Sequence, residues 1–282
     1  MRRPTNSRTP GSPSQADQDL LWPHLRDLPY FRAMLRAVEA GFYQGFDLPR
    51  PVLDVGCGDG HFASVAFRSP LEVGVDPWGG PIRQAAKLGA YTMLIQADAG
   101  RMPFPDGYFS SAISNSVLEH IPHIDDVLSE ISRALKPGAQ FYFCVPNQRF
   151  DENLWGAKLF ERSGSHRLAS RYQRFYDRIA RHVHLDSPEI WQKRLEKVGF
   201  EVLSCWDYFS PQALHALEWG HLFGLPSLLI HSLTGHWNLV RREWNFTLTR
   251  RLVARYYEEE IPHPEGVCTF YVARKVQSSA HG

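Results

Sequence analysis

Residues 52–62 read VLDVGCGDGHF, an apolar run that leads into a glycine-rich loop and then into a helical pattern. Glycine lets the chain turn sharply and approach a ligand closely, because a Cβ at such a position would collide with it. Gly56, Gly58 and Gly60 have the spacing G-x-G-x-G, one residue tighter than the G-x-G-x-x-G dinucleotide fingerprint. This spacing disfavours a pyrophosphate ligand, and with it an NAD-dependent oxidoreductase, and favours a smaller ligand.

Asp76 is the second informative residue, and it ends an apolar run 20 residues beyond Gly56. A carboxylate in this position can accept hydrogen bonds from both hydroxyls of a ribose, as in nucleotide-binding folds. The alternative is a turn aspartate that precedes Pro77. The glycine loop upstream favours the ribose site.

Two more candidate sites follow the next two strands. Asp98 places a side-chain acceptor beside the backbone N–H of Ala99, a pair that matches the donor–acceptor edge of adenine. The fourth strand ends in Ser114 and Asn115, followed by SVLEH at 116–120. Open α/β sheets bind their ligands at this carboxyl edge.

Strand and helix patterns alternate from residue 51 onward, which predicts a parallel sheet with helices on both faces. The predicted strands are residues 51–55, 71–76, 91–96, 109–114, 140–145, 200–206 and 267–273. A helix over 124–135 is broken by Lys-Pro-Gly at 136–138, and another begins at a Ser187 cap and runs to Gly199. Apolar residues at helical spacing over 31–42 predict a helix packed on the sheet, with a lid over the site as the alternative.

The chain is predicted to form one domain, residues 17–276, between a disordered tail at 1–16 and a short tail at 277–282. Two segments, about 147–186 and 209–264, are too long and too patterned for simple connections, so we expect helical insertions that cap the site.

Composition indicates a soluble, cytoplasmic protein. No run of 18 or more residues is dominantly apolar, and the N-terminus lacks the apolar core of a signal peptide. The four cysteines show neither a CxxC pair nor metal-ligand spacing, so no metal site is predicted and a reducing compartment fits best. A formal net charge of +1 leaves electrostatic preferences to local patches.

The ordered set of motifs resembles the class I S-adenosylmethionine-dependent methyltransferases, and within them the type 11 group of quinone, sterol and natural-product enzymes. The resemblance covers about residues 50–146 and the final helix and two strands. It implies a Rossmann-like, seven-stranded, mostly parallel sheet whose last strand, about 267–275, is antiparallel. It also implies S-adenosylmethionine as the cofactor.

The resemblance assigns roles to the matching residues. The glycine loop would line the methionine moiety, and Asp54 would hold its amino group. Asp76 would bind the ribose, while Pro77 and Trp78 would pack on adenine and Asp98 would contact its amino group. The predicted cofactor-binding residues are Asp54, Gly56, Cys57, Gly58, Gly60, Asp76, Pro77, Trp78, Asp98, Ala99, Ser114 and Asn115.

Methyl transfer from a sulfonium needs mainly alignment of the nucleophile with the methyl carbon in a site that excludes water. An acceptor hydroxyl or activated carbon can also need a base. His120 is the first catalytic candidate because it follows the fourth strand at the ligand edge, and His184 and His182 come next. For each of them the alternative is a structural histidine.

The first insertion suggests the kind of acceptor. Five arginines recur at steps of four and three residues, which would align them on one helix face: Arg167, Arg171, Arg174, Arg178 and Arg181. Leu168, Tyr172, Phe175 and Ile179 repeat this spacing one position later. A basic amphipathic helix is compatible with an anionic membrane or a phosphorylated substrate, and equally with a solvated face packed by its other side.

The leading hypothesis is therefore an S-adenosylmethionine-dependent methyltransferase that acts on oxygen or carbon of a small or lipid-like acceptor, with peripheral contact to an anionic membrane. One alternative is a cofactor-binding partner subunit without turnover. Another is an RNA methyltransferase, which near-neutral charge and the lack of an RNA-binding module disfavour.

Overall fold

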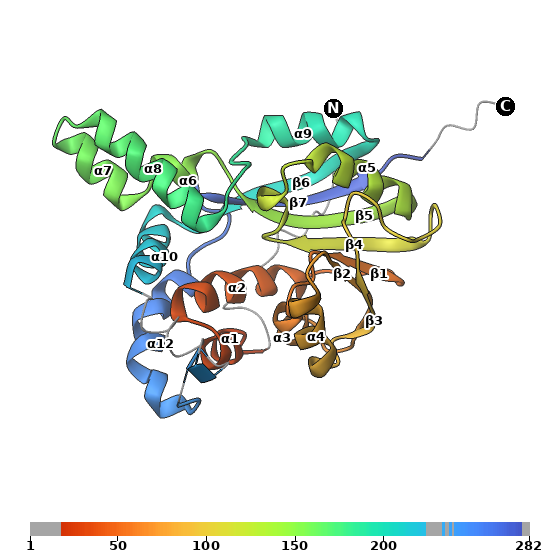
Figure 1. Ribbon diagram of the computed structural model, residues 1–282, viewed down its shortest axis with the longest axis horizontal. Coiled ribbons are helices and arrows are strands. Elements are labelled where there is room, and N and C mark those ends of the chain that lie inside the picture. Colours follow the sequence, from red (N-terminus) through yellow and green to blue (C-terminus); the bar gives the residue numbers. More distant parts are fainter. Residues whose placement is uncertain (1–17, 224–232, 235–236, 239, 278–282) are drawn as a thin grey trace, which may run out of the picture.

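Seven strands form one mixed sheet in the order β3-β2-β1-β4-β5-β7-β6 (Figure 1). Strands β1 to β5 pair in parallel, whereas β7 pairs antiparallel with both β5 and β6. The strands are β1 (Val52–Val55), β2 (Leu71–Asp76), β3 (Tyr91–Gln96), β4 (Phe109–Asn115), β5 (Leu135–Pro146), β6 (Phe200–Tyr208) and β7 (Cys268–Lys275). The predicted Rossmann-like, seven-stranded sheet with an antiparallel last strand is confirmed.

The computed structural model describes residues 18–223, 233–234, 237–238 and 240–277. The predicted tail at 1–16, residues 278–282 and part of the second predicted insertion, 224–232, lie outside the described residues.

The predicted start of the fifth strand, at residue 140, was wrong. Lys136-Pro137-Gly138 was expected to separate helix from strand, yet β5 already begins at Leu135. Leu135 pairs with Phe109 and Gln140 with Ser111, so β4 advances two residues while β5 advances five. A bulge, with Gly138 at a φ of 82°, absorbs the extra residues.

Smaller differences concern the helix after the first insertion. Helix α9 (Pro188–Lys197) ends two residues before Gly199, whose φ of 84° is left-handed. Ser187 occupies the N-cap position, but its side chain makes no capping hydrogen bond.

Two hydrophobic cores lie on opposite faces of the sheet. Val52 and Tyr142 belong to one core, and their neighbours Leu53 and Phe141 belong to the other, as expected from strand alternation. Helices α2 (Tyr30–Tyr43), α3 (His61–Ala66) and α4 (Gly79–Leu88) cover the first face, and α5 (Ile124–Ala134) and α9 cover the second (Figure 1). Phe42 of α2 is fully buried against Phe270, which confirms that the predicted helix over 31–42 packs on the sheet.

The described parts of both predicted insertions are mainly helical. The first contains α6 (Arg149–Glu152), α7 (Trp155–Arg162) and α8 (His166–Ala180), and α7 and α8 form a hairpin that projects from the sheet (Figure 1). The second contains α10 (Pro211–Phe223) and α12 (Glu243–Tyr257). Both pack against α2, and α12 also contacts α1 (Leu21–Asp27). Among the described residues, no helix combines the length and apolar character that crossing a membrane requires.

Helix α8 differs from the predicted amphipathic helix in two respects. Arg181 leaves the arginine stripe, because it follows the helix in a left-handed conformation with a φ of 60°. The apolar stripe does not form the packed side either: Leu168, Phe175 and Ile179 are all more than 40% exposed. The residues buried on α8 are Ala169 and Tyr176.

Candidate functional site

The glycine loop joins β1 to α3 through residues with positive φ. Gly56, Gly58 and Gly60 have φ values of 79°, 55° and 76°. A Cβ at Gly56 would lie 2.3 Å from the Val117 side chain, and one at Gly60 would lie 2.9 Å from the Cβ of Ala85, so both glycines are needed for packing. A Cβ at Gly58 would meet no protein atom within 4 Å. The space beside Gly58 is therefore open to a ligand.

Two buried carboxylates flank this loop. Asp54 accepts a hydrogen bond of 2.6 Å from the Tyr91 hydroxyl, and burial raises the pKa of Asp54 to about 7. Asp76 accepts hydrogen bonds from the backbone N–H groups of Gly58 (3.0 Å) and Trp78 (2.9 Å), one at each carboxylate oxygen. Burial raises the pKa of Asp76 as well. Each of its oxygens keeps a second lone pair, so Asp76 both fixes the loop and can accept bonds from a ligand.

Two adjoining cavities run along the carboxyl ends of β1, β2 and β4. One, of about 280 Å³, is lined by Asp54 and Asn115, and the other, of about 570 Å³, is lined by Asp76. They share Arg36, Gly56 and Gly58, and we refer to them together as the glycine-loop cavity. The larger part is also lined by Pro77, Trp78, Asp98 and Ala99.

The far end of this cavity combines an exposed ring with an ionised acceptor. Trp78 lines the edge of the cavity and is 70% exposed. Asp98 accepts a hydrogen bond of 2.7 Å from Gly100 N, and its Oδ1 lies 3.2 Å from His123 Nε2. These two contacts lower the pKa of Asp98, so it is a carboxylate at neutral pH.

Helix α2 contributes two charged residues that sequence reasoning missed. Glu39 is fully buried and accepts hydrogen bonds from Asn115 Nδ2 (2.6 Å), Ser116 Oγ (2.7 Å) and the Tyr208 hydroxyl (3.0 Å). Arg36 donates to the Asn115 carbonyl (2.8 Å) and lies on the cavity wall. Arg36 and Glu39 each directly follow an apolar residue of the stripe at 31–42. Charged residues next to the buried side of a helix were the sequence feature that could have revealed them.

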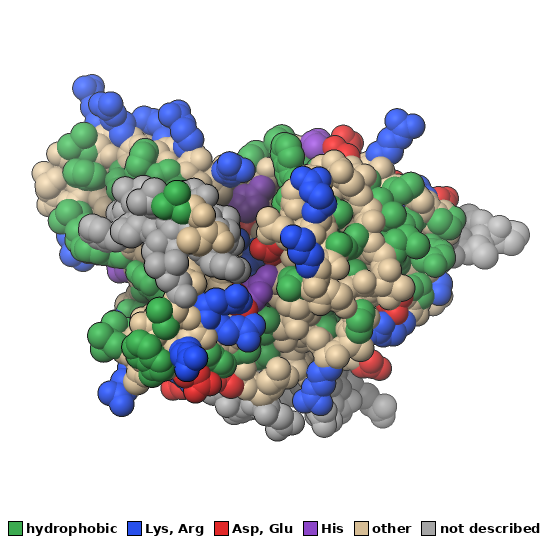
Figure 2. Space-filling model, turned by 60° about the horizontal axis from the view of Figure 1, so that its bottom comes forward, with side chains coloured by type: hydrophobic (Ala, Val, Ile, Leu, Met, Phe, Trp, Pro, Cys, Tyr) green, Lys and Arg blue, Asp and Glu red, His purple; other side chains and the backbone are tan. Residues whose placement is uncertain are grey.

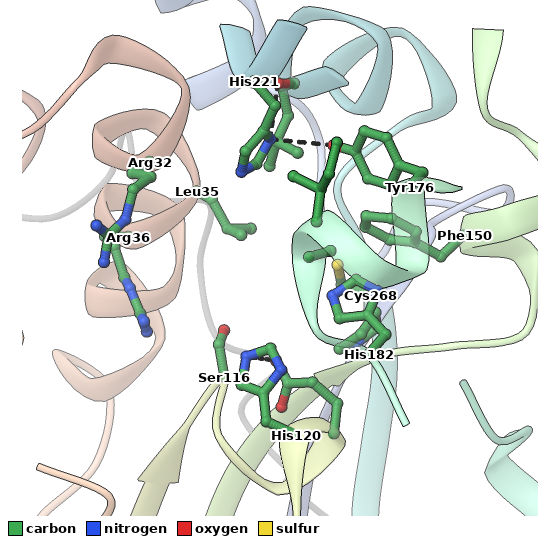
Figure 3. Close-up of a pocket in the computed structure, with 15 residues that line it drawn as sticks. Arg32, Leu35, Arg36, Ser116, His120, Phe150, Tyr176, His182, His221 and Cys268 are labelled. Atoms are coloured by element: carbon green, nitrogen blue, oxygen red, sulfur yellow. Dashed lines mark hydrogen bonds and ion pairs between the residues drawn. The ribbon is translucent and has the colours of Figure 1, made fainter. Parts of the chain in front are cut away.

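A second cavity, of about 210 Å³, opens beside the first. It shares Arg32, Arg36, Ser116, His120 and Ala180 with the glycine-loop cavity. Arg36 and His120 face each other across it (Figure 3). Figure 2 shows histidine side chains and lysine or arginine side chains around the hollow on this face of the molecule. The remaining residues that line the second cavity are Leu35, Glu119, Pro146, Phe150, Tyr176, Ile179, His182, Leu217, His221 and Cys268.

The family model described as "Methyltransferase domain" matches residues 24–205, which is more than half of the chain. The chain belongs to this methyltransferase family. S-adenosylmethionine is therefore its cofactor, as the sequence resemblance implies.

Curated relatives include the botryococcene C-methyltransferase of Botryococcus braunii, 35% identical over 36% of this chain and 30% of the relative. The fatty-acid O-methyltransferase of Mycolicibacterium smegmatis is 32% identical over 37% of this chain and 40% of the relative. The matches thus span less than half the length of these relatives. The crystal structure of geranyl diphosphate C-methyltransferase from Streptomyces coelicolor, in complex with Mg²⁺, geranyl diphosphate and S-adenosyl-L-homocysteine, has 15% identity and a TM-score of 0.51 over 88% of this chain and 84% of that one, and shows the shared fold.

The glycine-loop cavity fits this cofactor. The open space beside Gly58 and the free acceptor capacity of Asp76 suit a nucleoside with a charged tail. Cys57 also lines it, as a small buried thiol whose pKa is raised by burial. Ser114 and Gly60 are absent from its lining: the Ser114 hydroxyl is buried and donates to the Val55 carbonyl.

The three predicted catalytic candidates, His120, His184 and His182, are placed differently. His120 lies on the wall that both cavities share. His184 lines neither cavity, because its Nε2 bonds the Ile121 carbonyl (3.0 Å) and its backbone N–H bonds the Glu119 carbonyl. Its position is that of a structural histidine. His182, the third candidate, does line the second cavity.

Proposed function

We propose that this chain transfers a methyl group from S-adenosylmethionine to oxygen or carbon of a small or lipid-like acceptor. The observation that carries the proposal is the common wall of the two cavities, formed by Arg36, Ser116 and His120. A cofactor in the glycine-loop cavity and an acceptor in the second cavity would meet there, as methyl transfer by alignment requires.

The cofactor supplies an electrophilic methyl group, and the chain supplies binding and orientation. We assign the amino group of the methionine moiety to Asp54 and the ribose hydroxyls to Asp76. Trp78 and Pro77 would cover the adenine, and Asp98 would accept a hydrogen bond from its amino group. The backbone around Gly58 would line the methionine moiety.

The second cavity suits an acceptor with a hydrophobic body and a polar or anionic head. Leu35, Phe150 and Leu217 give it apolar walls, and Arg32 and Arg36 add two guanidinium groups. Relatives named as fatty-acid and botryococcene methyltransferases support an acceptor of this kind.

Isothermal calorimetry tests the cofactor site. The purified protein should bind S-adenosylmethionine and S-adenosylhomocysteine far more tightly than NAD. Asp76→Ala should weaken this binding by about 1.5–3 kcal/mol, since a hydrogen bond to a charged group is lost. Gly58→Val should weaken it further, because its side chain would fill the open space and disfavour positive φ. Asp106→Ala, at an exposed site outside the cavities, should bind normally.

Incubation with labelled cofactor and a cell extract tests turnover. A small molecule or lipid that carries one added, labelled methyl group is the expected product. Labelled RNA alone would favour the RNA methyltransferase, and tight cofactor binding with no labelled product would favour a partner subunit without turnover.

We further propose that α8 contacts an anionic membrane. Leu168, Phe175 and Ile179 are exposed on the same helix as the solvent-exposed Arg171 and Arg174. Exposed apolar side chains flanked by arginines are typical of helices that lie in a membrane interface. Ile179 also lines the second cavity, so this helix would place the cavity mouth close to a lipid acceptor.

A further inference from the structure

Glu119, His120 and His182 bring their ligand-type atoms together at the wall of the second cavity. One such atom from each residue lies within 4.8 Å of the others. Figure 3 shows the two histidines close together. Glu119 and His120 come from the turn η2 (Leu118–His120) after β4, and His182 comes from the loop after α8. The backbone N–H of Val183 donates to the Glu119 carbonyl (2.8 Å), which holds the two segments against each other.

Two polar atoms of this cluster are buried without a partner. They are Oε2 of Glu119, whose side chain is 3% exposed, and Nδ1 of His182. Buried polar atoms in folded proteins are nearly always hydrogen-bonded, or bound to an ordered water or ion. Two orphaned atoms from neighbouring ligand-type side chains therefore point to a bound group between them.

The tautomer of His120 also supports a bound ion. Its Nδ1 lies 3.0 Å from the Arg181 carbonyl, which can only accept, so Nδ1 carries the proton. The unprotonated Nε2 then lies 3.6 Å from Glu119 Oε1, beyond hydrogen-bond distance, and keeps a lone pair that can bind an ion. A histidine that binds a metal commonly donates its other ring N–H to a backbone carbonyl, which is the arrangement seen here.

We propose that Glu119, His120 and His182 form a binding site for one divalent transition-metal ion of the Zn²⁺ type. Two imidazoles and one carboxylate are a donor set that such ions favour, whereas Mg²⁺ prefers oxygen ligands and several waters. This reverses the expectation of no metal site and gives His120 a ligand role in place of the predicted base.

The position of the site indicates a role for the ion in binding the acceptor. It adjoins the second cavity, so a coordination position faces the space that the proposed acceptor would occupy. On the proposed function, from which this step follows, the acceptor would present an oxygen, such as a hydroxyl or carboxylate, to the ion. A metal ion in this position orients the acceptor oxygen and withdraws charge from it.

Cobalt(II) titration of the full chain, treated with EDTA and dialysed, tests the site without cofactor or acceptor. We expect a visible absorption band that saturates at one ion per chain, is displaced by Zn²⁺, and is unaffected by equimolar Mg²⁺. Glu119→Gln and His182→Asn should each weaken cobalt binding about 100-fold, as removal of a direct ligand should exceed the 10–100-fold cost of a second-shell change. His215→Asn, at a half-buried histidine outside the cluster, is the matched control and should bind like the parent.

Cofactor binding, measured in parallel by calorimetry, separates this proposal from the proposed function. S-adenosylmethionine should bind both variants as it binds the parent, which also shows that they are folded. Should one variant not fold, the other still decides the question. Cobalt binding that is absent, or equally strong in the parent and in the folded variants, would overturn the metal site. Loss of cofactor binding in the parent protein would instead overturn the proposed function and leave the metal result standing.

Discussion

Asp54 and Asp76 both lie at the carboxyl edge of the sheet, but their hydrogen bonds differ. Asp76 receives two backbone N–H groups, whereas Asp54 receives one hydroxyl. Burial raises the pKa of Asp54 to about 7, so its charge changes close to neutral pH. An ammonium group of the cofactor needs the ionised form. The ionisation of a single side chain should therefore control cofactor affinity.

We predict that affinity for S-adenosylmethionine rises with pH up to about 7 and is then constant. Below this pKa, protonation of Asp54 competes with binding, and affinity should fall about tenfold per pH unit. Asp54→Asn should bind weakly at all pH values and lose this dependence. Calorimetry at pH 5.5 and 8.0 measures the difference, and equal affinities in the parent protein would contradict the assignment of Asp54.

Helix α8 shows how an element's packing can depart from its sequence pattern. It is buried through Ala169 and Tyr176, and the ring of Tyr172 lies against Gly156 of α7, where a Cβ would be 2.4 Å away. This close packing through small and aromatic residues leaves Phe175 and Ile179 exposed. The exposed side of the hairpin is thus apolar and basic together, and basic and hydrophobic side chains share the left side of Figure 2.

We predict that replacing Arg171, Arg174 and Arg178 together by Gln weakens binding to vesicles that contain phosphatidylglycerol by about 100-fold. Each arginine near an anionic surface contributes about 1 kcal/mol. Cofactor affinity should not change. The matched control replaces three exposed arginines outside α8, Arg68, Arg83 and Arg101, by Gln. Co-sedimentation with vesicles measures both, and equal binding by the two triple variants would show that α8 is only a solvated helix.

Over the whole molecule, the buried Glu39 ties together elements that are distant in the sequence. It comes from α2 and accepts hydrogen bonds from Asn115 and Ser116 at the end of β4 and from Tyr208 at the end of β6. Arg36 of the same helix donates to the Asn115 carbonyl. The N-terminal helices are thus fixed to the sheet at the point where the two cavities meet.

We predict that Glu39→Ala lowers the free energy of unfolding by about 3 kcal/mol or more, because buried donors lose their common acceptor and Arg36 loses its partner. Urea denaturation followed by circular dichroism measures this loss. Glu201→Ala removes an exposed ion pair with Arg274 and should change the free energy by no more than about 0.5 kcal/mol. A similar small effect at both positions would contradict a structural role for Glu39.

The sequence by itself determined the sheet and the arrangement of the residues to which we assign the cofactor. The glycine loop, Asp76 and Asp98 follow consecutive parallel strands, and the carboxyl ends of such strands meet at one edge of the sheet. Their spatial proximity therefore follows from their order in the chain. The positive φ of Gly58 could be predicted for a different reason, because it depends only on the local backbone conformation of the loop.

Only the tertiary structure decided the second half of the site. The second cavity joins Arg32, Ser116, Phe150, Leu217 and Cys268, which come from separate segments of the chain. No periodicity or spacing relates such residues, because long-range packing places them together. The same packing determines burial, and burial leaves Oε2 of Glu119 without a partner and raises the pKa of this group to about 8. The sequence of the segment SVLEH does not indicate whether the Glu119 carboxylate is exposed to solvent or buried.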